Sequence, residues 1–219
     1  RRQEKLDELQ TQLGDKFIPL NFDVSDLPAT KTALQTLPND VLNNLDVLVN
    51  NAGLALGLEP ADKTDFADWQ QMVNTNILGL IHLTHEILPF MVANNDGYII
   101  NLSSTAGNYP YFGGNVYGAT KAFVTQFSLN LRADLVGKNI RVSNIEPGLC
   151  GGTEFSNIRF HGDDAKAAQV YNSVQYVTPQ DIANMVAWLI EQPKHVNINR
   201  IEVMPTAQTF AGLKVVKDL

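Results

Sequence analysis

Short runs rich in Val and Ile alternate along this chain with longer stretches whose apolar residues repeat at a helical period. The runs show little alternation of polar and apolar residues, which is typical of strands buried on both faces of a parallel sheet. Right-handed crossovers between such strands place helices on both faces of the sheet. The pattern therefore predicts an α/β fold with a doubly wound parallel sheet. The five predicted strands are residues 17–24, 45–53, 97–104, 139–148 and 197–205.

Four stretches between and before these strands are predicted to be helical. The chain opens on the charged amphipathic sequence "RRQEKLDELQ", and residues 65–92 and 115–136 carry apolar residues close to the 3.6-residue period. Residues 178–193 begin with a Thr-Pro pair, which suits an N-cap followed by the first helical position. No repeat, low-complexity tract or linker interrupts the pattern, so residues 1–219 are predicted to form a single domain.

Composition excludes several classes of function. The net charge of −7 argues against nucleic acid as a partner, because phosphates require a basic face. The four scattered histidines and the single cysteine, Cys150, give no metal-ligand spacing and no intramolecular disulfide, which fits a reducing cytoplasm. We find no apolar run of the roughly 20 residues that a membrane span requires. The sequence predicts a cytoplasmic protein without a metal.

The ends of the predicted strands carry polar and glycine-rich segments. They read "DV" at 23–24, "NNAG" at 50–53, "SSTAG" at 103–107 and "EPGLCGGTEF" at 146–155. Ligands of open parallel sheets bind in the crevice outside the carboxyl ends of the strands. We therefore expect these four segments to converge on one binding crevice.

Tyr117 and Lys121 are four residues apart on a predicted helix, so their side chains share one face. A free phenol has a pKa of about 10 and is a poor base, but a nearby ammonium favours the phenolate. Such a phenol could exchange a proton with an alcohol or carbonyl oxygen. Ser104 follows the preceding strand and could hold the same oxygen, while Asn76 interrupts a helical stretch. The alternatives are a solvated lysine, a turn serine and a satisfied core amide.

In combination, these residues resemble the short-chain dehydrogenase/reductase family. The resemblance covers nearly the whole chain and rests on "NNAG" at 50–53, Asn76, Ser104, "YGATK" at 117–121 and "PG" at 147–148.

The resemblance implies a Rossmann-like sheet, a nicotinamide cofactor and hydride transfer. It gives Tyr117 as the general acid/base and Ser104 as the group that orients the substrate oxygen. Lys121 would tune Tyr117 and grip the nicotinamide ribose. Asn76 would hold a water molecule in a proton relay.

One feature departs from the family pattern. The T-G-x-x-x-G-x-G loop that cradles the pyrophosphate after the first strand does not occur in these residues. In the family a pair of arginines follows the second strand, so Arg1 and Arg2 are expected to mark its end, with about one βα unit upstream of them. The fold is thus expected to be incomplete at its N-terminal side. Arginines at this place pair with a 2′-phosphate, which favours NADP over NAD; the alternative is two solvated arginines.

The resemblance also assigns cofactor contacts along the other strand ends. The alternatives are that Asp23 is a helix N-cap and that the loop after residue 146 is an ordinary surface loop. The assigned residues are Asp23 and Val24 at the adenine, Asn51 and Gly53 along the dinucleotide, and Pro147, Gly148, Thr153 and Phe155 around the nicotinamide and its phosphates.

Four stretches are similar to the NADP-dependent 3-hydroxy acid dehydrogenase subgroup, which includes serine and allo-threonine dehydrogenases and malonic semialdehyde reductases. They are "NNAGLALGLEPA", "GGNVYGATKAFV", "EPGLCGGTEFSN" and "MPTAQTFAGL". This similarity implies oxidation of a small 3-hydroxy acid, or reduction of the matching semialdehyde.

Arg159 is the candidate partner for the carboxylate of such an acid; the alternative is a solvated loop arginine.

Two competing functions stay open. One is reduction or oxidation of a different carbonyl or alcohol substrate, and the other is an NADPH-binding sensor without turnover. Family members usually form homotetramers through two long helices, here near 65–92 and 115–136.

Overall fold

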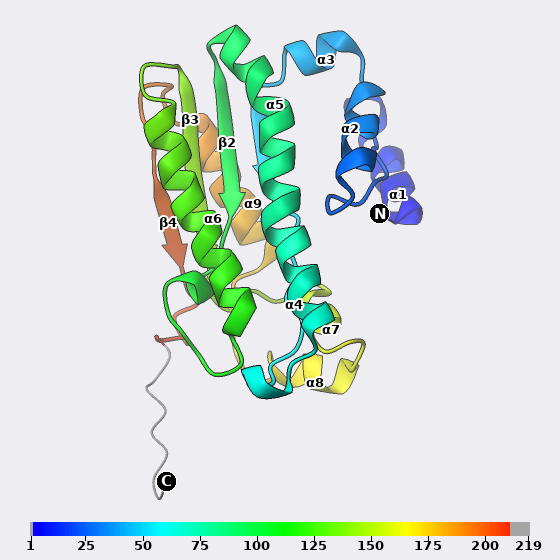
Figure 1. The fold of residues 1–219 in the computed structure, drawn as a ribbon, viewed down its shortest axis with the longest axis vertical. Helices are drawn as coiled ribbons and strands as arrows, with labels where there is room; N and C mark the ends of the chain where they lie inside the picture. Colours follow the sequence, from blue (N-terminus) through cyan, green and yellow to red (C-terminus); the bar gives the residue numbers. More distant parts are fainter. Residues whose placement is uncertain (1, 211–219) are drawn as a thin grey trace, which may run out of the picture.

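The computed structural model describes residues 2–210, and four parallel strands form its sheet (Figure 1). The strands are β1 (Val47–Asn50), β2 (Gly97–Leu102), β3 (Ile140–Pro147) and β4 (Arg200–Val203), and they lie side by side in this order. Val49 pairs with Ile100, and Asn144 pairs with both Asn101 and Arg200. The predicted parallel α/β sheet is confirmed.

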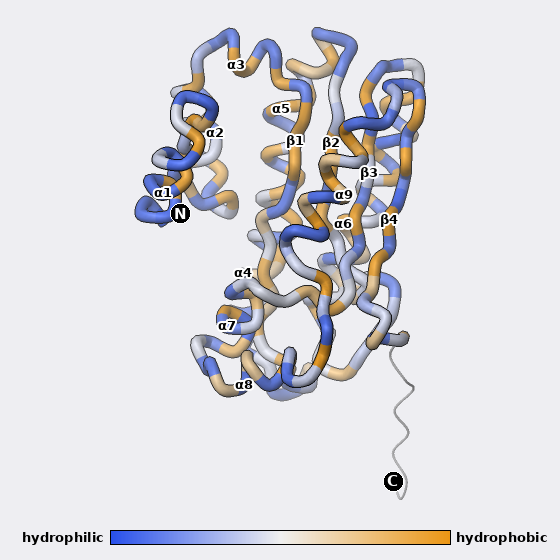
Figure 2. The backbone as a smooth tube through the Cα atoms, turned by 180° about the vertical axis from the view of Figure 1, so that it is seen from behind, coloured by the Kyte–Doolittle hydropathy of each residue, from blue (hydrophilic) through white to orange (hydrophobic). Residues whose placement is uncertain are grey.

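Helices cover both faces of the sheet, as Figures 1 and 2 show from opposite sides. On one face, buried side chains that include Ile99 and Val142 pack with Ile87 of α5 (Leu80–Asn94) and Leu131 of α6 (Asn115–Asp134). On the other face, Ile100 and Ile145 pack with Leu189 of α9 (Pro179–Glu191). Successive strand residues point to opposite faces, so a strand buried on both sides has to be apolar throughout. The doubly wound arrangement is therefore the direct outcome of the Val- and Ile-rich runs.

The remaining helices are shorter. The first three lie beyond the β1 edge of the sheet, and α1 is mostly hydrophilic in Figure 2. They are α1 (Gln3–Leu13), α2 (Leu27–Gln35), α3 (Asn39–Asn43), α4 (Phe66–Val73), α7 (Phe155–Arg159) and α8 (Asp164–Gln169), with 3-10 turns η1 (Gly14–Lys16), η2 (Ala61–Lys63) and η4 (Thr105–Gly107).

The helix predicted at 65–92 is continuous over Phe66–Asn94, but its middle turn, η3 (Asn74–Gly79), is π-helical. By length and composition alone Phe66–Asn94 could cross a membrane. It instead packs its Ile87 and Met91 on the sheet and buries the polar Asn76 and Thr84. These features are typical of a core helix in an α/β fold.

The predicted start of the helix at 178–193 is confirmed. Thr178 is the N-cap of α9 and forms a capping box with Asp181: the Thr178 hydroxyl accepts from the Asp181 amide, and the Asp181 carboxylate accepts from the Thr178 amide. Pro179 takes the first helical position.

The prediction of a strand at 17–24 is wrong for this structure. Phe17 has an extended backbone, but no strand among residues 2–210 lies beside this segment, so it forms no ladder of hydrogen bonds. The end of the segment packs instead on the π-helical turn, because a Cβ placed at Gly79 would lie 2.9 Å from the Val24 carbonyl oxygen.

A glycine shapes the approach to α6. Gly113 has a φ of +78°, and a Cβ added there would overlap the Leu58 carbonyl oxygen, so the 111–114 turn lies directly against the loop that follows β1. We expect Gly113→Ala to lower the free energy of unfolding by about 3 kcal/mol or more, since it combines a left-handed backbone with a steric clash. Urea unfolding followed by circular dichroism measures this loss.

Gly137→Ala is the matched control, because Gly137 has a φ of +84° and nothing within 4 Å of an added Cβ. It isolates the backbone effect, for which we expect a loss of about 1–2 kcal/mol. Equal losses in the two variants would contradict the close approach of Gly113 to Leu58.

Candidate active site

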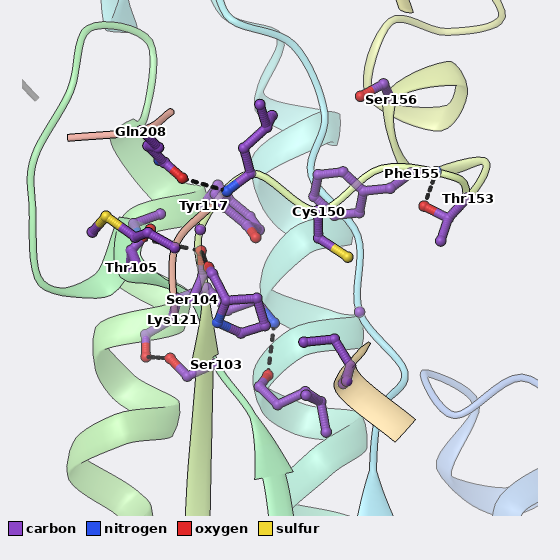
Figure 3. A pocket seen from close by; sticks show the side chains of 18 of the residues that line it. Ser103, Ser104, Thr105, Tyr117, Lys121, Cys150, Thr153, Phe155, Ser156 and Gln208 are labelled. Carbon is purple, nitrogen blue, oxygen red and sulfur yellow. Dashed lines mark hydrogen bonds between the residues drawn. The ribbon is translucent and has the colours of Figure 1, made fainter. Parts of the chain in front are cut away.

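A cavity of about 780 Å³ opens at the carboxyl edge of the sheet, where the loops after β1, β2 and β3 meet (Figure 3). The expected convergence is confirmed for three of the four strand exits; the segment at 23–24 does not line the cavity. The residues singled out from the sequence that do line it are Asn51, Gly53, Ser104, Tyr117, Lys121, Pro147, Gly148, Thr153, Phe155 and Arg159.

Ser104 is placed by the end of β2. It is the N-cap of the 3-10 turn η4, where its Oγ accepts from the Ala106 amide at 3.1 Å and donates to the Pro147 carbonyl at 3.2 Å. The second bond joins the exits of β2 and β3. A hydroxyl that is held from both sides faces the cavity in a defined direction, next to Tyr117 in Figure 3.

Tyr117 and Lys121 lie on the first two turns of α6, as the i, i+4 spacing predicted. Gly107 lets η4 pack directly on this helix, because an added Cβ would lie 2.7 Å from backbone atoms of Lys121 and Ala122. Both side chains are buried, with 8% of Tyr117 and 6% of Lys121 exposed. The sequence thus brings the proposed acid/base pair to the edge of the cavity beside Ser104.

The expectation that Lys121 lowers the pKa of Tyr117 is wrong for this structure. Burial raises the pKa of Tyr117 to about 12, while hydrogen bonding with Ser104 and the charge of Arg159 oppose the shift. The Lys121 Nζ lies 5.9 Å from the centroid of the Tyr117 ring. Loss of water around the phenolate outweighs the nearby cations, so Tyr117 carries its proton at neutral pH.

Lys121 is held from the other side by β2. Its Nζ donates to the Leu102 carbonyl at 2.8 Å, and no carboxylate among residues 2–210 forms a salt bridge with it. Burial lowers its pKa to about 8, because a charged amine loses solvation in the interior. Lys121 is therefore a buried cation without a counter-charge in the described part of the chain.

Asn76 lies in the π-helical turn behind the cavity. Its Oδ1 accepts from the Leu54 amide, and its Nδ2 donates to the Leu54 carbonyl and to the Thr120 hydroxyl, at 2.8–3.0 Å. A Cβ at Gly53 would lie 3.3 Å from both the Asn76 Oδ1 and the Lys121 Nζ. Both amide hydrogens of Asn76 are thus used by protein atoms, and the residue fixes the Gly53 loop next to Lys121. Its expected role in holding a water molecule stays a prediction.

Arg159 ends α7 and reaches into the cavity. Its Nε donates to the Gly57 carbonyl at 3.1 Å and its Nη2 donates to the Tyr111 hydroxyl at 2.8 Å. The Gly57 amide in turn donates to the Arg159 carbonyl, so the helix is bound to the loop after β1 by both backbone and side chain. The guanidinium carbon lies 5.6 Å from the centroid of the Tyr117 ring. This places a cation next to the predicted acid/base.

Two residues of the site were missed by the sequence reasoning. Tyr111 orients Arg159, and the Gln208 Oε1 accepts from the Leu149 amide at 2.6 Å, which fixes the loop after β3 (Figure 3). Both line the cavity. Gln208 lies within the stretch "MPTAQTFAGL", but neither residue was singled out from the sequence, because each acts through a partner that is remote in the chain.

The structure does not bring the predicted adenine and 2′-phosphate contacts to this cavity. Arg2 forms an ion pair with Glu154 at 2.6 Å, with more than half of each side chain exposed, while Arg1 lies outside the described residues. Asp23 accepts from the amide and hydroxyl of Ser25 and is not the N-cap of α2, which is Asp26.

The residues of the cavity fit the nicotinamide and ribose part of NADP. The Lys121 ammonium has three donors and gives one to Leu102, so further donors are available for ribose hydroxyls. The loops that carry Asn51, Gly53 and Pro147 provide the surrounding wall. Among residues 2–210 no cluster of three or more His, Cys, Asp or Glu is placed to hold a metal ion.

The burial of Lys121 makes a prediction about stability and pH. Burial lowers the pKa of Lys121 from 10.5 to about 8. Between pH 8 and 10.5 the amine is therefore protonated in the unfolded chain and neutral in the folded protein. The folded state accordingly becomes more stable relative to the unfolded state as the pH rises through this range. At pH 7 the burial of the charged Lys121 lowers the free energy of unfolding by its full amount, about 3 kcal/mol. Replacing the lysine removes this destabilisation. The replacement also leaves the Leu102 carbonyl without its hydrogen-bond donor, which costs about 1–2 kcal/mol.

We therefore expect Lys121→Met to be more stable than the parent by about 1–2 kcal/mol at pH 7 and less stable at pH 10.5. Urea unfolding at both pH values measures the difference. Lys63→Met, at an exposed position, is the control and should show no such reversal. A difference between Lys121→Met and the parent that is the same at both pH values would rule out the buried cation.

Comparison with known proteins identifies the family. The family model described as short chain dehydrogenase matches residues 1–163. A probable NADP-dependent dehydrogenase of Haemophilus influenzae is 67% identical over 218 residues, which cover all of this chain and 86% of that protein. An NADP-dependent 3-hydroxy acid dehydrogenase of Escherichia coli (strain K12) is 55% identical over 215 residues, covering 98% and 86%.

Among solved structures, the closed form of a serine dehydrogenase complexed with NADP+ is 54% identical and superposes with a TM-score of 0.97, covering 100% of this chain and 88% of that one. The parallel sheet with helices on both faces agrees with this superposition. The chain belongs to the short-chain dehydrogenase family.

Proposed function

We propose that this protein is an NADP-dependent dehydrogenase that oxidises the hydroxyl group of a small 3-hydroxy acid, such as serine or allo-threonine, or reduces the matching semialdehyde. The observation that carries the proposal is the arrangement of Ser104 and Tyr117 around one cavity, with buried Lys121 behind them and Arg159 beside them. The names of the relatives and of the solved neighbour agree with this activity.

The chain supplies the proton and the orientation for this reaction. When NADP is bound, its nicotinamide supplies the hydride chemistry. Ser104 would turn its hydroxyl hydrogen from the Pro147 carbonyl to the substrate oxygen and donate a hydrogen bond to it. Tyr117, whose pKa burial raises to about 12, is protonated at neutral pH and so would donate its proton to the carbonyl oxygen in the direction of reduction. In the direction of oxidation it has to accept a proton, so turnover should rise with pH through the basic range.

Lys121 would hold the ribose of the cofactor with its free donors, and Asn51 and Gly53 would line the dinucleotide. The loop with Pro147, Gly148, Thr153 and Phe155 would cover the nicotinamide, since it borders the same cavity. The proposal keeps Arg1 and Arg2 as ligands of the 2′-phosphate, with Asp23 and Val24 at the adenine. In that case the exposed Arg2–Glu154 pair would have to open.

Arg159 would bind the carboxylate of the substrate. It borders the cavity 5.6 Å from the Tyr117 ring, and the Gly57 carbonyl and Tyr111 hydroxyl use donors on Nε and Nη2 only. The rest of the guanidinium fork can pair with a carboxylate. In a 3-hydroxy acid the reacting carbon is two bonds from the carboxyl carbon, so a cation beside the acid/base suits such a substrate.

The proposal extends to the assembly of the protein. It treats residues 1–219 as one cytoplasmic dinucleotide-binding domain that forms a homotetramer through the Phe66–Asn94 helix and α6. Both helices expose large apolar side chains, among them Phe66, Leu78 and Phe123, which is consistent with an interface. Analytical ultracentrifugation tests the tetramer.

Tyr117→Phe tests the proposed chemistry. We expect it to lower kcat for serine oxidation by about 10²- to 10⁴-fold, because proton transfer by a positioned group contributes on this order. The dissociation constant for NADPH, measured by fluorescence titration, should change little. Tyr109→Phe is the control, since Tyr109 also lines the cavity but its hydroxyl donates to Glu202. Normal turnover in Tyr117→Phe would overturn the assignment.

Arg159→Met tests the carboxylate contact. We expect kcat/KM for serine to fall by about 10- to 100-fold, the usual effect of removing a charged hydrogen-bond partner. The value for serinol, which has no carboxylate, should be affected much less. Unchanged KM for serine would remove Arg159 from the substrate site, and an equal loss for both substrates would indicate a structural role.

A further inference from the structure

Glu146, next to Pro147 at the end of β3, is a fully buried carboxylate that the proposed mechanism does not use. Its Oε1 accepts from the Arg200 Nε at 2.8 Å, and its Oε2 accepts from the Arg200 Nη2 at 2.7 Å. This is a two-point pair between β3 and β4. Arg200 is 41% exposed, so the arginine covers the carboxylate from the solvent side.

The carboxylate is also bound to the elements that carry the site. Its Oε2 accepts from Asn108 Nδ2 at 2.7 Å, and Asn108 follows the 3-10 turn whose N-cap is Ser104. Arg200 reinforces this link, because its Nη2 donates to the Asn108 Oδ1 at 3.0 Å. The loop that carries Ser104 is thus attached to the ion pair by both atoms of one amide.

A second link leads to α6. The Thr125 hydroxyl lies 3.2 Å from the Glu146 Oε1 and 3.0 Å from the Ser103 Oγ. The Ser103 hydroxyl in turn donates to the Lys121 carbonyl at 2.6 Å. A third link is the chain itself, because Pro147 follows Glu146 and its carbonyl accepts from Ser104. The three links converge on the Ser104 hydroxyl and on the turn of α6 that holds Lys121.

Stability alone does not account for this arrangement. Apolar side chains of similar volume often stabilise an interior as well as a buried ion pair does, because both charges lose their hydration. What a two-point Arg–carboxylate pair adds is direction: it restricts the planes of both groups and the positions of every donor bound to them.

We infer that Glu146 and Arg200 form a positioning pair, which holds the Ser104 hydroxyl and the Lys121 turn of α6 in register across the cavity. The inference rests on the proposed function for its effect on turnover, but the geometry of the pair stands apart from the choice of substrate. Neither residue lines the cavity, so neither is a catalytic residue.

Arg200→Lys tests the pair in the intact protein, because lysine keeps the charge and loses the two-point geometry. We expect kcat to fall by about 10- to 100-fold, the effect of a small misplacement of reacting groups, while KM for the hydroxy acid changes less than about twofold. Arg141→Lys is the matched control. Arg141 lies at the other end of β3, where its guanidinium donates to the Leu189 carbonyl of α9 and to the carbonyl of the C-cap residue Gln192, so its replacement should leave kcat unchanged.

A double-mutant cycle separates positioning from a general loss of order. Since the pair acts in part through Ser104, Arg200→Lys should lower kcat by a smaller factor in a Ser104→Ala background than in the parent, because coupled residues are not additive. Additive losses would overturn the inference. If Arg200→Lys does not fold, Asn108→Ala removes the link from the loop side and takes its place in the cycle.

Amide hydrogen exchange supplies a readout that does not depend on turnover. We expect the amides of residues 103–109 to exchange about tenfold faster or more in Arg200→Lys than in Arg141→Lys, because the loop loses its attachment to β3 and β4. Unchanged exchange would overturn the inference. Faster exchange in a protein that oxidises none of the proposed substrates would retain the pair as a positioning device and discard only the substrate assignment.

Discussion

The site depends on one buried cation and on the carbonyl that holds it. Lys121 is almost fully buried, and its described contact is the hydrogen bond to the Leu102 carbonyl at the end of β2. An uncompensated ammonium is unfavourable in a protein interior, and burial lowers its pKa to about 8. Close packing of η4 on α6 at Gly107 covers the backbone of Lys121, and the residue lines the cavity. A site of this kind favours a ligand with hydroxyl or phosphate oxygens.

Burial also decides the protonation of Tyr117. The same exclusion of water that lowers the pKa of Lys121 raises that of Tyr117 to about 12. One cause thus shifts the pKa values of two neighbouring groups in opposite directions. The pKa of Tyr117 moves away from neutral pH, and that of Lys121 moves towards it. The phenol is therefore protonated at neutral pH, and Lys121 has the lower pKa of the two, at about 8.

Polar side chains connect this site to the sheet beneath it. Asn76 binds the loop after β1, Ser104 joins the ends of β2 and β3, and Glu146 with Arg200 joins β3 to β4. Hydrogen-bonded groups in a low-dielectric interior fix directions more strictly than apolar packing does. The carboxyl edge of the sheet therefore combines an apolar core below with a hydrogen-bonded polar layer above it, next to the cavity.

The sequence alone was sufficient for the sheet, its four strands at 45–53, 97–104, 139–148 and 197–205, and the pairing of Tyr117 with Lys121 on one helix face, because these follow from local periodicity. It was not sufficient for the segment at 17–24, since a strand also needs a neighbour to bond with. It gave the wrong direction for the pKa of Tyr117, because desolvation depends on everything that packs around the phenol. Tyr111 and Gln208 entered the site through partners 48 and 59 residues away, and Arg200 binds Glu146, 54 residues away, outside the cavity. Contacts of that range are decided by tertiary packing, which no local pattern in the sequence records.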